Sequence, residues 1–459
     1  GQINADVVDG SAGVNCSDRE VNIKILLDRV VRDGDLTAKQ RDELLVALAD
    51  DVAADVLADS DAQTRAVHLD SAQAPAMRDV HARYLDALEG SGRIDRARGE
   101  LPGTDELMAR AEIGGGLQLP EFALLLAHSR IELSDQLLGS DAPEDPFLGR
   151  ELERYFPAVL RERHPRRIRE HPLRREIIAS RVANGVVDRA GMTFVWRLAD
   201  ETGLSAPDVV RAHTAAREIF GLNELWAGLE ALDDVIATRT QISLFLELRR
   251  LAERATRWVL RNREQPLDIA ETVEHIGPGV RELTPLIPQL IGEERRDALE
   301  RTVRDHVAAG VPEELARAVR TSPDLIAALD ITSVSRATGR PVGEVAAVHF
   351  ALEEHLRLGW LRSRILDLPR DQRWPALARA ALRDDLHVVH SAITAEVVRS
   401  GWSGGDGREQ VRDWIATTDT AAMRCLRLLD EIAASGRSDL ATVSVALREI
   451  RTLVRAGCG

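Results

Sequence analysis

The sequence predicts a mainly α-helical protein, and its composition, hydrophobic spacing and capping residues all point that way. Aromatic residues make up only 3% of the chain, and Ala, Leu, Val, Arg, Glu and Asp fill most positions. Straight-chain residues such as Leu, Arg and Glu lose little rotamer freedom in a helix, so this composition favours helices over sheets. Apolar residues also recur at helical spacing through most of the chain.

The first 18 residues depart from this pattern and look like a passage from within a larger domain. They combine Gly, Ser, Asn and Asp with short β-like apolar pieces, and they lead into a helical pattern that Gly34 ends. This is typical of a strand–loop–helix passage. Ser17 then stands at the start of the helix, with Glu20 three residues later, which predicts a Ser-x-x-Glu capping box.

Caps and apolar stripes predict the helices that follow. Thr37 and Gln40 form a capping box that satisfies free N–H groups at one helix start, and Pro120 marks the first turn of another. A nearly continuous helical pattern runs from 176 to 263. The predicted buried faces are Leu44, Leu45, Leu48, Val52 and Val56; Phe122, Leu125, Leu126 and Leu133; and Ile242, Phe245, Leu248, Leu251, Ala252, Ala255, Trp258 and Val259.

The length of the chain predicts more than one domain. It has 459 residues, whereas single cores stop growing at roughly 250 to 300 residues. The turn-rich stretches 90–105 and 139–146 predict connections, and a new block of helices follows Gln265 and Pro266. We therefore expect two or three domains.

One unit of the sequence occurs twice. TGLSAPDVVRAH at 202–213 is similar to TGRPVGEVAAVH at 338–349. In each copy a helix should end at Thr-Gly, with Gly203 or Gly339 as a left-handed cap, and a second helix should follow. Ser205 and Asp208 predict a capping pair in the first copy. Two structural helical hairpins are favoured over DNA-binding helix-turn-helix units, because few cations lie where bases would be contacted.

The charge balance argues against a nucleic-acid-binding protein. The formal net charge is −15, and phosphate neutralisation needs clustered cations that dominate the surface field. Cys16, Cys425 and Cys458 show neither metal-ligand spacing nor an even count, which indicates a reducing compartment. The chain shows no signal peptide and no apolar run that could span a membrane, so we expect a cytoplasmic protein.

Two further clusters carry alternative interpretations. The basic run at 161–175 contains Arg166, Arg167, Arg174 and Arg175, and an ion-paired surface is favoured over an anion or effector site. His387 and His390 follow Asp384 and Asp385 at a spacing that places them on one helical face. His349 and His355 lie near Glu353 and Glu354. No third ligand follows at matching spacing, so ordinary helix-face histidines are favoured over a metal site.

Several motifs, in sequence order, resemble the large bacterial NAD-dependent glutamate dehydrogenases. NCSDREVNIKI at 15–25, preceded by DGSAGV at 9–14, is similar to the family's substrate loop. LPEFALLLAHSRI at 119–131, YFP at 155–157, HPLRREII at 171–178 and NGVVDRAGMTF at 184–194 look like later landmarks of that family. The resemblance implies that 1–60 end a Rossmann-type catalytic domain, 61–265 form a helical region and 266–459 form a C-terminal helical domain.

The resemblance also implies substrate contacts. The family's loop reads Asn-Ala-Gly-Gly-Val-Thr-Val-Ser, which places its valine at Val14 and its serine at Ser17. Ser17 would donate its hydroxyl to a carboxylate oxygen of L-glutamate or 2-oxoglutarate, and Val14 would pack beside the substrate's methylenes. Gly13 would permit a close backbone approach. Asn15 stands where the family has threonine or aspartate.

Other groups needed for the reaction are missing from this sequence. Gly10 stands where the family has an asparagine on the nicotinamide side, and glycine cannot supply that amide. The Gly-rich turn after a strand that binds dinucleotides is absent, since Gly114 to Gly116 predict a loop. Lys24 and Lys39 lack the glycine-rich context of the family's catalytic lysine. We therefore expect NAD to be bound largely outside this chain, and this chain alone to be inactive.

Three hypotheses follow. The first is a segment of an NAD-dependent glutamate dehydrogenase, which supplies a substrate loop and a helical region for homo-oligomer formation or regulation. The second is a non-catalytic helical protein-interaction module. The third, a nucleic-acid regulator built on the Thr-Gly repeats, agrees least with the acidic composition.

Overall fold

The computed structural model describes residues 4–98, 101–369, 373–400, 406–417, 419–436 and 439–457, and the regular elements within them are all helices. The prediction of a mainly α-helical fold is confirmed. The chain divides into two compact units, of which the first comprises 1–214 and 259–270 and the second comprises 215–258 and 271–459. No helix in the described part of the chain is long and apolar enough to cross a membrane.

The first unit is built mainly from the helices that begin before residue 214, the last of which continues into the second unit. They are α1 (Asp6–Asp9), α2 (Ser11–Arg32), α3 (Ala38–Ala47), α4 (Ala49–Ser71), α5 (Arg78–Gly90), η1 (Arg96–Arg98), α6 (Thr104–Ala109), η2 (Arg110–Ile113), α7 (Leu119–Leu138), η3 (Ala142–Glu144), α8 (Arg150–Tyr155), α9 (Ala158–Arg163), α10 (Pro165–Arg169), α11 (Arg174–Ala190), α12 (Phe194–Thr202) and α13 (Ala206–Ile219).

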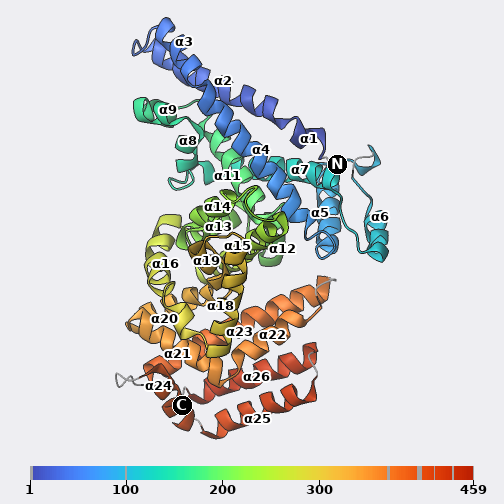
Figure 1. Ribbon diagram of the computed structural model, residues 1–459, viewed down its shortest axis with the longest axis vertical. Coiled ribbons are helices and arrows are strands. Elements are labelled where there is room, and N and C mark those ends of the chain that lie inside the picture. The colour runs from blue at the N-terminus through green and yellow to red at the C-terminus, as the bar shows by residue number, and fades with distance from the viewer. Residues whose placement is uncertain are drawn as a thin grey trace. The chain divides into compact units, whose positions relative to one another are not determined.

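The core of the first unit lies where α4, α7 and α11 pack against one another. α7 begins as predicted, with Pro120 in its first turn and Glu121 in a capping box, and it buries Phe122, Leu125 and Leu126. α2 packs along α4, and the two helices run side by side in blue in Figure 1. α2 is therefore held on the outside of this three-helix core.

The second unit contains the later helices. They are α14 (Leu222–Glu230), α15 (Thr238–Asn262), α16 (Ile269–Leu283), α17 (Ile287–Leu290), α18 (Glu293–Ala308), α19 (Glu313–Leu325), α20 (Ala327–Thr338), α21 (Val342–His355), α22 (Leu358–Asp367), α23 (Arg373–Arg399), α24 (Gly407–Thr417), α25 (Asp419–Ser435) and α26 (Leu440–Gly457). α21 packs against α20, α22, α23 and α24 and buries residues around most of its circumference, as a central helix must.

Both copies of the repeated unit fold as predicted. α12 ends at Thr202 and α20 ends at Thr338, and Gly203 (φ +72°) and Gly339 (φ +68°) follow in the left-handed conformation. A second helix begins shortly after each glycine. In the first copy the Ser205 hydroxyl donates to Asp208 Oδ2 over 2.6 Å, which confirms the capping pair. In both copies the repeat therefore encodes two helices that are joined at a left-handed glycine.

The strand–loop passage predicted for residues 1–18 is not present in the described part of that segment. Residues 6–9 form α1 and residues 11–32 form α2. The prediction failed because the inner side of α2 continues toward its N-terminus through polar Asn15, Arg19 and Asn22, so no apolar periodicity marked the helix. The position of the segment within an α/β domain is a separate expectation.

The helix predicted after Thr37 is divided in two. The capping box between Thr37 and Gln40 is present at the start of α3. α3 ends at Ala47, Leu48 joins it to α4, and α3 itself buries no side chain. Only Leu48 and Val56 of the predicted stripe are fully buried. The prediction gave one helix because Leu48, at the junction, has helical backbone angles. An apolar stripe that crosses such a junction looks in the sequence like a stripe along a single helix.

Candidate functional site

The predicted substrate-contacting residues lie inside α2 and divide between two sides of that helix. Asn15 is half-buried, whereas Gly13, Val14 and Ser17 are exposed. Successive residues are displaced by about 100° around a helix axis. Ser17 therefore lies nearly opposite Arg19, and the helix has an inner side with Asn15 and Arg19 and an outer side with Ser17.

The predicted capping role of Ser17 is wrong. α2 begins at Ser11, so Ser17 lies well inside the helix, where it caps nothing. Gly13 likewise forms no tight turn, because it is helical and does not have a positive φ. A Cβ added at Gly13 would meet nothing within 4 Å in this chain. Neither residue is therefore required by the local fold of the described chain.

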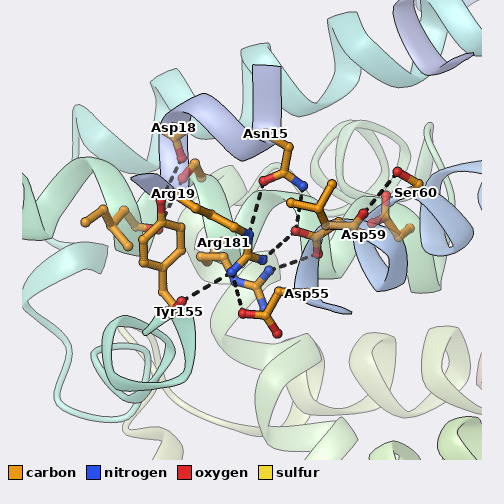
Figure 2. Close-up of polar contacts among 12 residues, drawn as sticks. Asn15, Asp18, Arg19, Asp55, Asp59, Ser60, Tyr155 and Arg181 are labelled. Atoms are coloured by element: carbon orange, nitrogen blue, oxygen red, sulfur yellow. Dashed lines mark hydrogen bonds and ion pairs between the residues drawn. The ribbon is translucent and has the colours of Figure 1, made fainter. Parts of the chain in front are cut away.

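A buried arginine occupies the middle of the inner side of α2. Arg19 is only 4% exposed. Its Nη1 donates to Asp55 Oδ2 over 2.8 Å and to the backbone oxygen of Tyr155 over 3.3 Å. Its Nη2 donates to Asp59 Oδ2 over 2.6 Å, and its Nε donates to Asn15 Oδ1 over 3.2 Å. Figure 2 shows the guanidinium surrounded by these partners, so its planar set of donors is almost fully used.

Asp59 joins three helices at this point. It accepts hydrogen bonds from Arg19 of α2, from Asn15 Nδ2 over 3.0 Å, and from Arg181 Nη1 of α11 over 3.2 Å. Burial pushes its pKa upward, but the hydrogen bond from Arg19 and the charge of Arg181 outweigh burial and lower the pKa overall. Asp55 has fewer partners, and burial raises its pKa. Asp59 is thus the better stabilised carboxylate.

Tyr155 forms a second contact with the inner side of α2. Its hydroxyl donates to Asp18 Oδ2 over 2.8 Å and accepts from Asn22 Nδ2 over 2.9 Å. The Arg19 guanidinium carbon also lies 5.2 Å from the centroid of the Tyr155 ring, within the range of a cation–π contact. Three polar residues of α2 are therefore bound by one tyrosine at the end of α8.

The His171 side chain binds the backbone of α2 in the same region. Its Nε2 lies 3.1 Å from the backbone oxygen of Asn22, and its Nδ1 accepts from the backbone N–H of Leu173 over 3.1 Å. A carbonyl can only accept, so Nε2 carries the proton. Burial lowers the pKa of His171, which favours this neutral form.

The predicted basic run forms ion pairs within the chain. Arg167 lies 2.5 Å from Asp33, which directly follows α2. The other pairs are Arg166 with Glu170, Arg169 with Glu153, and Arg174 and Arg175 with Glu144. These pairs agree with the ion-paired surface, and Arg167 adds a contact near the C-terminal end of α2.

The outer side of α2 exposes apolar side chains and adjoins a groove. Val14 is 75% exposed and Val21 is 50% exposed, one turn on either side of Ser17. The groove, of about 690 Å³, lies between α2, α3 and α4. Its lining includes Cys16, Glu20, Ile23, Lys24, Leu45, Val46 and Val52. The exposed side of α2 and α3 thus offers a surface for further contacts.

The lysines and the glycine run lie in other settings. Lys24 is within α2 and pairs with Glu20, and Lys39 lies near the start of α3, 3.8 Å from Glu43. Gly114 (φ +68°) ends η2, and α7 starts only at Leu119, so 114–116 form the predicted loop. In the described part of the chain this loop follows no strand.

Of the histidines in the second unit, His349 and His390 are buried, whereas His355 and His387 are partly exposed. The rings of His349 and His390 stack with centroids 3.6 Å apart, and His387 Nδ1 lies 3.8 Å from Asp330 Oδ2. His355 contacts a backbone oxygen of its own helix, that of Ala351. Among the described residues, no group of three or more His, Cys, Asp and Glu side chains could hold a metal ion. Cys16 is an exposed free thiol and Cys425 a buried one, while Cys458 lies outside the described residues.

Sequence reasoning missed Arg19, Asp55, Asp59, Asn22 and Arg181 as a cluster. A signal for them existed, because Asn15, Arg19 and Asn22 repeat at the spacing of one helical face and continue into buried Leu26. Polar residues on the buried side of a helix need polar partners elsewhere. The sequence did not say which carboxylates would supply them.

Comparisons with known proteins agree with the motifs. Residues 114–452 match the family model described as glutamate dehydrogenase, C-terminal, and residues 1–70 match the one described as bacterial NAD-glutamate dehydrogenase, catalytic domain. Curated proteins named NAD-specific glutamate dehydrogenase are similar throughout: 37% identical over 455 residues in Mycobacterium tuberculosis, 39% over 456 in Pseudomonas aeruginosa and 37% over 457 in Halomonas elongata. Each alignment covers 99% of this chain but only 28% of the relative.

Proposed function

The chain belongs to the bacterial NAD-glutamate dehydrogenase family, and from that membership we propose that it forms part of an enzyme that oxidises L-glutamate. The reaction converts L-glutamate, NAD and water into 2-oxoglutarate, ammonia and NADH. The names of the relatives support this assignment, and the chain spans less than a third of their length. The enzyme would work in the cytoplasm.

The part that this chain would contribute is the outer side of α2. Ser17 would donate its hydroxyl to a substrate carboxylate, a charge-assisted hydrogen bond that is stronger than a neutral one. Val14, one turn earlier, would cover the substrate's methylenes. Gly13 would leave room for the substrate, and Asn15 would support the site from its inner edge. The observation that carries this proposal is that Gly13, Val14 and Ser17 are exposed on a helix whose opposite side is firmly bound.

NAD would be bound mainly by a part of the enzyme outside this chain. The described residues offer no strand followed by a Gly-rich turn, which is the usual dinucleotide cradle. We therefore assign no residue of this chain to the cofactor. The exposed groove beside α3 would receive the remainder of the catalytic domain, since the segment 1–70 matches that domain and α3 buries no side chain of its own.

The second unit would support homo-oligomer formation or regulation. Trp374 is 72% exposed and Val388 is 66% exposed on α23. They are four turns apart and so lie on the same side of that helix. Large exposed apolar side chains on one face are typical of protein–protein contacts. Trp374→Ser together with Val388→Ser should lower the oligomeric mass in analytical ultracentrifugation if this face forms a subunit contact.

The experiment that tests the proposed function compares three proteins in glutamate-dependent NAD reduction. They are this chain alone, the chain extended upstream to the length of its relatives, and the extended chain with Ser17→Ala. Activity is expected only with the extension, and Ser17→Ala should raise the KM for glutamate while leaving the KM for NAD unchanged. An unchanged KM for glutamate in that variant would show that Ser17 does not bind the substrate.

A further inference from the structure

The inner side of α2 is polar over two turns where an apolar stripe would suffice for packing. Asn15, Arg19 and Asn22 occupy these positions, and the stripe becomes apolar only from Ile23 and Leu26 onward. Apolar contacts are non-directional and tolerate small rotations or shifts of a helix. A guanidinium with fixed partners does not tolerate such shifts of the helix, because its hydrogen bonds need defined directions.

The partners of these polar residues come from both of the matched family segments. Asp55 and Asp59 lie in the segment 1–70, which matches the catalytic domain, as α2 does itself. Tyr155, His171 and Arg181 lie in the segment 114–452, which matches the C-terminal family model. The C-terminal segment therefore contacts α2 directly through Tyr155 and His171, and Arg181 binds Asp59 of α4, which in turn pairs with Arg19.

We propose that Arg19 is a positioning residue for substrate binding, which fixes the rotation and axial position of α2 so that Ser17 faces the substrate. Arg19 does not itself touch substrate, since it is buried on the opposite side of the helix. It acts through the Asp59 and Asp55 ion pairs and through Tyr155. This inference rests on the proposed function, because it assigns Arg19 to the same substrate contact.

A stabilising role alone explains this cluster less well. Arg19 is buried and its two carboxylate partners are partly exposed, so the ion pairs must offset the cost of removing the guanidinium from water. Well-packed apolar residues often stabilise a fold equally well. What a satisfied polar cluster adds is a single defined arrangement. Here that arrangement holds Asn15 to Asp59 and Asn22 to Tyr155, one on each side of Ser17 in the sequence.

The test is a double-mutant cycle in the full-length enzyme, with Arg19→Lys, Ser17→Ala and both together. Lysine keeps the charge but cannot reproduce the planar set of donors. Arg130→Lys is the matched control, because Arg130 donates through Nε and Nη2 to Asp188 Oδ1, a pair that joins α7 to α11 and includes no residue of α2. Asp55→Asn is a milder second variant, since the Asp55 side chain is 43% exposed. Thermal unfolding of each variant shows that it is folded.

Arg19→Lys is expected to raise the KM for glutamate by about tenfold, since small misplacements of a binding group have effects of this size or more. Asp55→Asn should raise it less, and Arg130→Lys should leave it unchanged even if it lowers the melting temperature. In the Ser17→Ala background, Arg19→Lys should add no further increase. If Ser17→Ala raises the KM but folded Arg19→Lys and Asp55→Asn do not, the positioning role is wrong. If Ser17→Ala itself has no effect, the proposed substrate contact fails and the positioning role fails with it.

Discussion

Arg19 and Tyr155 are separated by 136 positions in the sequence, yet the Arg19 guanidinium donates to the Tyr155 backbone oxygen and lies 5.2 Å from the centroid of its ring. The same tyrosine binds Asp18 and Asn22 by its hydroxyl. One residue of the C-terminal family segment thus meets three polar side chains of α2. α2 therefore depends on partners that lie far along the chain.

Tyr155→Phe should loosen α2. The change removes the hydroxyl that joins Asp18 and Asn22, and the loss of such buried hydrogen bonds costs about 1–3 kcal/mol. Hydrogen exchange of the α2 amides should become faster. Tyr84→Phe is the matched control, because Tyr84 is also buried and donates to Glu132 over 3.2 Å, but does so away from α2. Equal effects of the two variants on α2 would contradict the account.

Gly13→Ala should separate folding from substrate binding. Alanine is favoured over glycine inside a helix by about 0.8–1 kcal/mol, and a Cβ at Gly13 meets nothing within 4 Å. The chain should therefore unfold at a slightly higher urea concentration. In the full-length enzyme the same methyl group would enter the space left for the substrate and raise the KM for glutamate. A variant that is both more stable and unchanged in KM would exclude a substrate role for Gly13.

Alanine at Gly116 and alanine at Gly185 should have opposite effects on the free energy of unfolding. A Cβ at Gly116 would lie 2.6 Å from the backbone oxygen of Ala74, whereas a Cβ at Gly185 inside α11 would meet nothing. Gly116→Ala should therefore lower the free energy of unfolding by about 1–3 kcal/mol, the usual cost of overpacking. Gly185→Ala should raise it by up to about 1 kcal/mol. Urea unfolding monitored by circular dichroism measures both free energies of unfolding. If Gly116→Ala left the free energy of unfolding unchanged, the loop and Ala74 would not be in close contact.

The buried histidines of the second unit should make the fold sensitive to acid. Burial lowers the pKa of His390 to about 4. An unfolded histidine has a pKa of about 6.5, so between roughly pH 6.5 and 4 the unfolded chain binds protons that the folded chain excludes. This stability is fully present above about pH 6.5 and falls as the pH drops below it.

His390→Gln tests that pH dependence. Glutamine keeps an N–H that could donate to the backbone oxygen of His349, as His390 Nε2 does over 2.9 Å, but it does not titrate. Between pH 7 and 5 the variant should lose less free energy of unfolding than the parent, by about 1–2 kcal/mol. Identical pH profiles would mean that His390 is not a buried neutral histidine.

The sequence predicted the helical fold where caps and apolar stripes agree. α7 is an example, because Pro120 in its first turn and the stripe from Phe122 to Leu133 signal the same helix. The start of α2 was not predicted, because Asn15 and Arg19 occupy the inner side of the helix. Polar residues at these positions give no hydrophobic periodicity. Their shared partner Asp59, and Arg181 that binds Asp59 in turn, lie far along the chain. Pairing between distant helices depends on packing that a periodicity pattern does not encode.

The most direct test of the central claim is an experimental structure of the full-length enzyme with 2-oxoglutarate bound. The account predicts the Ser17 hydroxyl about 2.6–3.0 Å from a carboxylate oxygen of the ligand, with Val14 against its methylenes and Arg19 still paired with Asp59 on the opposite side of α2. A ligand bound elsewhere, with the outer side of α2 covered by protein, would contradict it.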